Sequence, residues 1–149
     1  MRKGTQNCVH TPGVNKRVNV FITLLWPSRR IRYNIYPHRR ATEFKRHLQG
    51  LVAYVKQNGY RRLILIIDNA KAHRSPEIQN YAEKNHAVLQ LFYLPSYSPQ
   101  LNEVEGRINK RIKHEVLANH QHKTLQSLKK AIRTCLRAYN NRQKHVDST

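Results

Sequence analysis

An unbroken run of apolar residues, Leu63–Ile67, constrains the fold more than any other segment of the chain. Consecutive branched aliphatic residues suit a strand covered on both faces, as in a parallel sheet, better than a half-exposed strand. The run ends at Asp68 and Asn69. In open α/β sheets ligands bind beyond the carboxyl ends of the strands, so Asp68 is well placed to hold a metal or a substrate. An equally weighted interpretation is that Asp-Asn only begins a turn, as it often does after a strand.

Other strands are predicted on both sides of this run. Residues 1–16 show no apolar periodicity, so we expect irregular structure and no strand there. Residues 17–25 and Ile31–Tyr36 are rich in β-branched and aromatic side chains, and the segment WPSRR between them predicts a hairpin turn. A further strand is predicted for residues 88–94.

Four helices are predicted from apolar side chains at helical spacing. The first begins near the N-cap Thr42, and the second begins at the N-cap Ser75. The last two cover about residues 101–119 and the segment that begins at Thr124. The order ββαβαβαα, without a linker or a repeat, predicts a single α/β domain over residues 1–149, with a mixed sheet flanked by helices.

The charge of the chain indicates its partner. With 28 Lys and Arg against 8 Asp and Glu, the formal net charge is +20. Such a charge says nothing about the fold, but it favours polyanions, above all nucleic acid, with an anionic membrane surface as the weaker alternative. No apolar segment reaches the roughly 18 residues of a membrane span, and the basic start is not followed by the apolar run of a signal peptide. We therefore expect a cytoplasmic protein associated with the chromosome.

Glu105 falls within the apolar stripe of the helix predicted for residues 101–119. At about 100° per residue, the stripe also contains Leu101, Val104, Ile108, Ile112 and Val116. Burying an unpaired carboxylate costs several kcal/mol, so Glu105 requires a cation, a metal or several hydrogen-bond donors. On the same helix Glu103 points to solvent, and Glu115 lies near the stripe, where it can reach water or pair with a lysine.

A basic face is predicted along the last two helices. A charge run is usually a solvated face, but the positive excess over the whole chain favours contacts with phosphates. Such contacts carry little sequence information. The predicted DNA-binding residues are Arg107, Lys110, Arg111, Lys113, Lys129, Lys130, Arg133 and Arg137.

The histidines and cysteines do not predict a zinc site. Cys8 and Cys135 lie far apart, and no pair of ligands is followed by a second pair at finger spacing. His73 is different because it follows Asp68 by five residues. It could orient a carboxylate, a water or a phosphate, although a surface histidine is the commoner outcome.

Two longer motifs carry a family resemblance. The segments ILIIDNAKAHRS and YLPSYSPQLNEVEG resemble the catalytic signature of mariner-like insertion-sequence transposases, in the DDE superfamily with a ribonuclease H-like fold. The second motif matches the family pattern at Pro95, Ser98, Pro99, Leu101, Asn102 and Glu105. The 36 residues between Asp68 and Glu105 also suit the spacing of the family's second and third acidic residues.

The resemblance implies DNA strand cleavage and strand transfer with two divalent metal ions, Mg²⁺ or Mn²⁺, held by three carboxylates. Asp68 would be the second of these carboxylates and Glu105 the third, as catalytic residues and metal ligands. Asn69, His73 and Asn102 would support them. Glu103 stands where the family usually has proline, which adds negative charge beside the site.

The chain departs from the family upstream of Asp68. No Asp precedes Asp68, and the only earlier acid, Glu43, falls in a predicted helix. The family's first strand, with the first acidic ligand, and its helix-turn-helix region are therefore not found, which predicts an N-terminally truncated catalytic domain with unpaired sheet edges. Its expected partners are DNA and the missing N-terminal part or another transposase chain. Two hypotheses follow: a DDE enzyme that is inactive alone, or a non-catalytic basic DNA-binding remnant.

Overall fold

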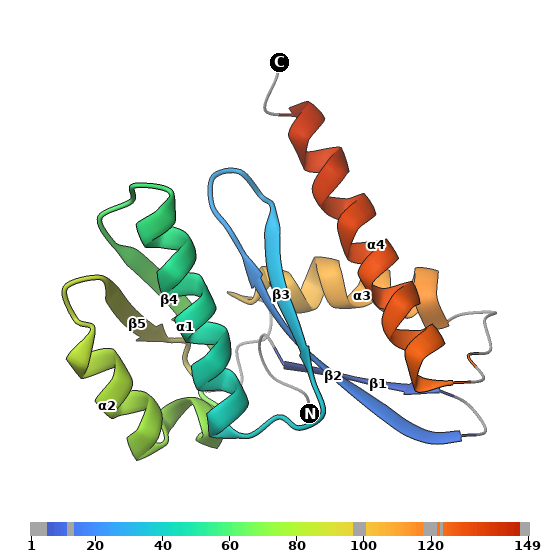
Figure 1. Cartoon of the computed structure of the whole chain (residues 1–149), viewed down its shortest axis with the longest axis horizontal. Coiled ribbons are helices and arrows are strands. Elements are labelled where there is room, and N and C mark those ends of the chain that lie inside the picture. Colours follow the sequence, from blue (N-terminus) through green and yellow to red (C-terminus); the bar gives the residue numbers. More distant parts are fainter. Residues whose placement is uncertain (1–5, 12–13, 97–100, 118–121, 123, 147–149) are drawn as a thin grey trace.

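The computed structural model describes residues 6–11, 14–96, 101–117, 122 and 124–146. Its strands form two sheets against which the helices pack (Figure 1). In chain order the elements are β1 (Gln6–Thr11), β2 (Val14–Leu24), β3 (Ile31–Tyr36), α1 (Ala41–Gln57), β4 (Leu63–Ile67), the 3₁₀ turn η1 (Lys71–Arg74), α2 (Pro76–Lys84), β5 (Leu89–Tyr93), the π-helical η3 (Val104–Asn109), α3 (Lys110–Ile112), the π-helical η4 (Lys113–Leu117) and α4 (Leu125–Val146).

The strands divide into an antiparallel and a parallel group. The first sheet has the antiparallel order β1-β2-β3, and the second is the parallel pair β4-β5. The α/β class and the order of the elements from β2 onwards agree with the prediction. Within the described residues the strands form two separate sheets and not one continuous sheet, which agrees with the unpaired edges expected from the sequence.

β2 lies between two hydrophobic cores. Val20 and Ile22 belong to one core, together with residues of η3, α3 and α4 such as Ile132. Phe21 belongs to the other core, together with residues of α1, β4 and β5 such as Leu48. Successive side chains of a strand point to opposite faces, so the single strand β2 contributes to both cores.

Only one face of the β4-β5 pair is covered among the described residues. Leu65 and Ile67 are buried against α1 and α2, but Ile64 and Ile66 are 59% and 60% exposed. Phe92 on β5 lies beside Ile66 in the register and is also exposed. The prediction that this strand is covered on both faces is therefore wrong for the described part of the chain. The reason is spatial: α3 and α4 lie over β2 and β3 (Figure 1).

β1 was not expected from the sequence. Gln6–Thr11 pairs with β2 in an antiparallel ladder that runs from Gln6 opposite Phe21 to Thr11 opposite Val14. The sequence of this segment has no apolar periodicity that would predict a strand. The strand forms because backbone hydrogen bonds join it to β2, and strand formation depends strongly on such a neighbour. The prediction of irregular structure over residues 1–16 is wrong for these residues.

The first turns of α1 and α2 show how the sequence starts each helix. At α1 the Glu43 side chain accepts a hydrogen bond from the backbone N–H of Arg40, so the N-cap is Arg40 and not Thr42 as predicted. At α2 the prediction is confirmed, because the Ser75 hydroxyl accepts a hydrogen bond from the Ile78 N–H. Both arrangements satisfy N–H groups that a helix start leaves without a partner.

The predicted helix of residues 101–119 begins later and is more loosely wound than expected, and residues 118 and 119 lie outside the described residues. The described helical run covers η3, α3 and η4, from Val104 to Leu117. Val104, Ile108, Ile112 and Val116 are buried, as the stripe predicted. Leu101 is exposed, because it precedes the start of this run.

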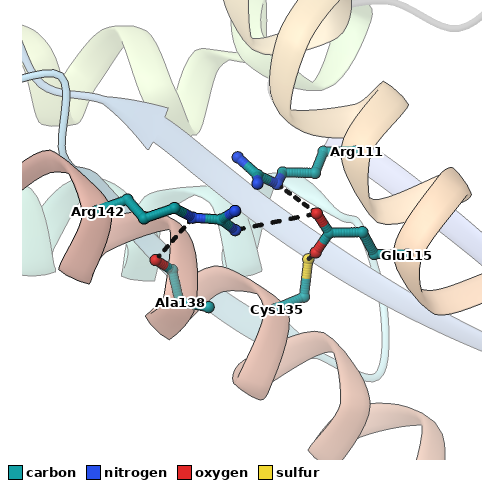
Figure 2. A network of polar contacts seen from close by, with 5 residues as sticks. All are labelled: Arg111, Glu115, Cys135, Ala138 and Arg142. Atoms are coloured by element: carbon teal, nitrogen blue, oxygen red, sulfur yellow. Dashed lines mark hydrogen bonds and ion pairs between the residues drawn. The ribbon is translucent and has the colours of Figure 1, made fainter.

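α4 is tied to the preceding helical run by a polar network around Glu115 (Figure 2). The Glu115 carboxylate accepts a hydrogen bond of 2.7 Å from Arg111 Nε, and Arg142 lies 3.9 Å away. The Cys135 thiol donates a hydrogen bond of 3.4 Å to the same carboxylate. Burial, and to a lesser extent this hydrogen bond, raises the pKa of the Cys135 thiol to about 11. Glu115 therefore pairs with two arginines, Arg111 and Arg142. None of the described helices, α4 included, is long and apolar enough to cross a membrane.

α4 is also attached to the hairpin by Asn140. Its Oδ1 atom accepts a hydrogen bond of 2.7 Å from the Ile31 N–H, and its Nδ2 atom donates to the Ile31 carbonyl at 3.0 Å. A single amide thus satisfies both backbone groups of the first residue of β3. This pair of bonds fixes the base of the β2-β3 turn on α4.

A buried histidine joins α1 to the hairpin. His47 is 1% exposed; its Nδ1 atom lies 2.7 Å from Asn34 Oδ1 and its Nε2 atom 2.8 Å from Thr23 Oγ1. The amide oxygen can only accept, so the ring proton is on Nδ1 and Nε2 accepts from the hydroxyl. Burial, assisted by Arg32 and then by His73, lowers the His47 pKa from 6.5 to about 3. The folded protein therefore keeps this ring neutral.

Acidification is expected to destabilise the fold through His47. In the unfolded chain His47 becomes protonated near pH 6.5, whereas in the folded chain it becomes protonated only near pH 3. The stability that comes from keeping His47 neutral is therefore fully present above pH 6.5 and is lost as the pH falls toward 3. The loss is about 1.4 kcal/mol of unfolding free energy per pH unit in this window. Urea unfolding at pH 7 and pH 5 should show a smaller pH effect for His47→Gln than for the unchanged chain. The exposed His38→Gln is the control, and equal pH effects in both variants would contradict the assignment.

Candidate active site at the carboxyl ends of β4 and β5

Asp68 lies directly after β4 and is 6% exposed. Its Oδ1 atom is 2.5 Å from His73 Nδ1 and accepts a hydrogen bond of 3.2 Å from the Ala70 N–H. The second contact is that of an Asx turn, so the turn interpretation from the sequence is correct in part. The contact with His73 goes beyond a turn, because it pairs the carboxylate with an imidazole from the next element.

Two oxygen atoms at this strand end have no hydrogen-bond partner among the described residues. They are Asp68 Oδ2 and Asn69 Oδ1, and each is buried. An unsatisfied buried acceptor costs about 1–3 kcal/mol, and more when it is charged. Carboxylate and amide oxygens are the ligands that Mg²⁺ and similar hard cations prefer. These two residues therefore fit a divalent metal.

His73 is held rigidly and is fully buried, so the expectation of a surface histidine is wrong. Its ring centroid lies 4.1 Å from that of Phe44 on α1. Its carbonyl accepts a hydrogen bond of 2.8 Å from the Tyr93 hydroxyl, which in turn accepts one of 2.9 Å from Gln79. Burial raises the Tyr93 pKa, so this hydroxyl keeps its proton. His73 is thus held through its ring by Phe44 and through its carbonyl by Tyr93, and its imidazole in turn contacts the Asp68 carboxylate.

Phe44 and Tyr93 were not singled out from the sequence. Phe44 was recognised only as part of the apolar stripe of its helix, and a stripe does not say which residue a ring will contact. Tyr93 ends β5 and acts through a bond to a backbone carbonyl, which leaves no pattern in the sequence. A tyrosine at the end of a parallel strand, where ligands bind, is the one signal that could have drawn attention to it.

The loop after β5 runs beside the loop after β4. The Leu94 N–H donates to the Ile67 carbonyl at 2.7 Å, and Asn69 Nδ2 donates to Ser96 Oγ at 3.1 Å. The chain then reaches Asn102, whose side chain accepts a hydrogen bond of 3.1 Å from the Val104 N–H. Asn102 thus caps the start of η3, the element that carries Glu105.

Glu105 lies in η3 directly after the buried Val104. Its side chain, like Ser98 and Pro99 of the same motif, falls outside the described residues, so its role as a ligand stays a prediction. Glu103 is exposed, as expected of the solvent-facing acid on this segment. Within the described side chains no three His, Cys, Asp or Glu residues gather closely enough to hold a metal.

The predicted DNA-binding residues are not equally accessible. Arg111 is half-buried, because its guanidinium binds Glu115 and lies 5.8 Å from the Tyr139 ring centroid. Lys129 is also half-buried. The exposed members are Arg107, Lys110, Lys113, Lys130, Arg133 and Arg137.

The fold and the motifs around Asp68 define a member of a nuclease class. The chain belongs to the DDE superfamily endonuclease family, whose model matches residues 1–129. No curated protein matches its sequence.

Solved structures show the same ribonuclease H-like fold. The catalytic domain of Mos1 mariner transposase matches with a TM-score of 0.68 at 16% identity, over 95% of this chain and 77% of that one. The catalytic core domain of HTLV-2 integrase, in complex with magnesium, matches with a TM-score of 0.56 at 15% identity, over 89% of this chain and 79% of that one. The Mos1 strand transfer complex matches with a TM-score of 0.63 at 16% identity, over 91% of this chain but only 43% of the transposase chain. The fold is thus that of a mariner-like catalytic domain.

Proposed function

We propose that this chain is the catalytic domain of a mariner-like transposase and that it takes part in DNA cleavage and strand transfer. The observation that carries the proposal is the Asp68 carboxylate at the end of β4, with one oxygen fixed by His73 and the other without a partner among the described residues. A DDE superfamily endonuclease needs such a carboxylate, and the position is the one where α/β sheets bind ligands.

The proposed metal ligands are Asp68 and Glu105, with Mg²⁺ or Mn²⁺ as the ion. Catalytic domains of the Mos1 transposase have been solved with each of these metals. A bound divalent ion would activate the attacking oxygen and stabilise the leaving oxygen of a phosphodiester.

The protein's own residues supply position. His73 holds Asp68 Oδ1, so that Oδ2 stays directed away from the imidazole. Asn69 adds an amide oxygen, and its amide nitrogen links the two loops through Ser96. Asn102 accepts a hydrogen bond from the Val104 N–H at the start of η3. This bond fixes where the helical run begins, one residue before Glu105.

The wider setting of the protein follows from the same proposal. Residues 1–149 would act as one partial catalytic domain in a bacterial cytoplasm, bound to chromosomal DNA. The Mos1 structures include a paired-end complex with a transposon end, which favours DNA and a further transposase chain as partners here.

The test is nicking of supercoiled plasmid by the full chain, with and without Mg²⁺ or Mn²⁺. Metal-dependent nicking that is lost in Glu105→Ala and kept in Glu103→Gln would support the proposal. Nicking that persists in Glu105→Ala would indicate a contaminating nuclease. DNA binding without any metal effect would favour the second candidate, a basic DNA-binding remnant, for which the net charge of +20 is the supporting observation.

A further inference from the structure

Exposed aromatic and arginine side chains gather on two turns of the molecule. We call this surface the aromatic tip and define it by Trp26 and Arg29 in the β2-β3 turn and Tyr60, Arg61 and Arg62 in the α1-β4 turn. Trp26 is 70% exposed and Tyr60 is 61% exposed, the two largest values among the exposed apolar side chains described. Single exposed apolar residues are normal on protein surfaces, but here each of the two exposed aromatic rings is accompanied by exposed arginines.

The two turns lie at the same end of the molecule. Figure 1 shows the β2-β3 turn and the α1-β4 turn at one end, and the carboxyl ends of β4 and β5 toward the other. A contact links the elements that carry the turns, because the Arg32 guanidinium at the start of β3 lies 4.5 Å from the ring centroid of Tyr54 on α1. The aromatic tip is thus separate from the site around Asp68.

The β2-β3 turn has a defined conformation. The Leu25 N–H donates to the Arg30 carbonyl at 2.7 Å, and the Arg29 N–H donates to the Leu25 carbonyl at 2.8 Å. The base of the turn is fixed to α4 by the two bonds between Asn140 and Ile31. Trp26 is therefore presented on a rigid support, which lowers the entropy cost of binding.

Arg29 occupies an unfavourable backbone conformation that places it beside Trp26. Its φ angle is 60°, in the left-handed region that favours glycine. Its guanidinium lies 5.3 Å from the Trp26 ring centroid. Hairpin loops often contain one left-handed residue, and here that residue holds a guanidinium close to the exposed ring.

The charge of the aromatic tip specifies the ligand class. The chain has no Asp or Glu between Glu43 and Asp68, and none before Glu43, so both turns are free of acids. The Arg29, Arg61 and Arg62 side chains of the two turns are exposed to solvent. Guanidinium groups bind phosphates, and exposed aromatic rings stack on unpaired bases of any identity.

We infer that the aromatic tip binds single-stranded DNA, with an unpaired base stacked on Trp26 and the backbone phosphates held by the neighbouring arginines. This contact adds to the proposed function a surface that recognises unpaired DNA at a distance from Asp68. This contact needs no metal ion, so it can be tested in the absence of divalent metal, where no metal-dependent cleavage takes place.

The protein contains a single tryptophan, so its fluorescence reports on the aromatic tip alone. The full chain is titrated with oligo(dT) in buffer containing EDTA, and binding is followed by Trp26 fluorescence and by the anisotropy of a labelled oligonucleotide. We expect quenching that saturates with binding. Trp26→Ala should weaken oligo(dT) affinity about 5- to 150-fold, the range for loss of one base-stacking contact, and Trp26→Phe should retain most of the affinity.

The controls separate stacking from general charge. Arg46→Gln near the start of α1 removes an exposed charge far along that helix from the α1-β4 turn and should leave the Trp26 quenching intact, whereas Arg29→Gln should reduce it. Unchanged affinity in Trp26→Ala, or saturating anisotropy without quenching, would overturn the inference. A fluorescence change that follows protein concentration without DNA would also overturn it, by identifying a contact between copies of the chain. A failed nicking assay would leave this result unaffected, because EDTA excludes the metal.

Discussion

Raising the salt concentration from 50 to 200 mM is expected to weaken duplex DNA binding about 10³- to 10⁵-fold. The reason is counterion release, because each phosphate that a lysine or arginine neutralises frees a condensed cation, and the expected number of contacts is roughly 6–10. Six of the predicted DNA-binding residues are exposed on η3, α3, η4 and α4, and further arginines lie on the turns. The measurement is fluorescence anisotropy of a labelled duplex over this salt range.

Single substitutions test which charges take part. Arg133→Gln should reduce the slope of log affinity against log salt by about 1, the value for loss of one phosphate contact. Arg111→Gln should change the slope much less, because the Arg111 guanidinium already binds Glu115 (Figure 2). A shallow slope in the unchanged chain, or equal effects of the two substitutions, would contradict a phosphate-binding surface on these helices.

Asp68→Asn is expected to abolish specific binding of Mn²⁺. The substitution keeps the size of the side chain and the Asx turn, but it removes the charge and exchanges one oxygen ligand for an amide nitrogen that cannot bind a cation. The loss should exceed the 10- to 100-fold weakening of metal affinity that is typical when a residue supporting a ligand is replaced. His73→Ala, which removes such a support, should fall within that range.

Isothermal titration with Mn²⁺ measures these affinities, and circular dichroism shows whether each variant is folded. Glu103→Gln is the matched control, because it removes an exposed acid close to Glu105 and should leave the metal affinity nearly unchanged. Retained Mn²⁺ binding in a folded Asp68→Asn chain would show that the metal is held elsewhere, and the proposed ligand set would then be wrong.

The sequence predicted the features that depend on local pattern. The buried stripe from Val104 to Val116 follows from helical periodicity, and the start of α2 follows from the capping chemistry of Ser75. The position of Asp68 at a strand end followed in the same way from the apolar run before it. Each of these inferences uses residues that lie within a few positions of one another.

The features that were missed depend on contacts between distant segments. β1 forms because β2 is available as its partner, and His73 is buried because Phe44 on α1 packs against its ring. Ile64 is exposed because α3 and α4 lie over β2 and β3 and not over β4. The apolar sequence of β4 alone does not predict where these helices lie. The metal-ligand role of Glu105 comes from resemblance to the family, and the Glu105→Ala variant in the nicking assay tests it.

The position of β2 between two cores makes the domain one cooperative unit. Phe21 and its neighbours Val20 and Ile22 follow one another in the chain but are buried in opposite cores. Separating β2 from the α4 side would therefore expose the side chains that also support α1 and β4. The helices that carry the basic residues and the strands that position Asp68 cannot melt as independent lobes, so damage to either half lowers the stability of the other.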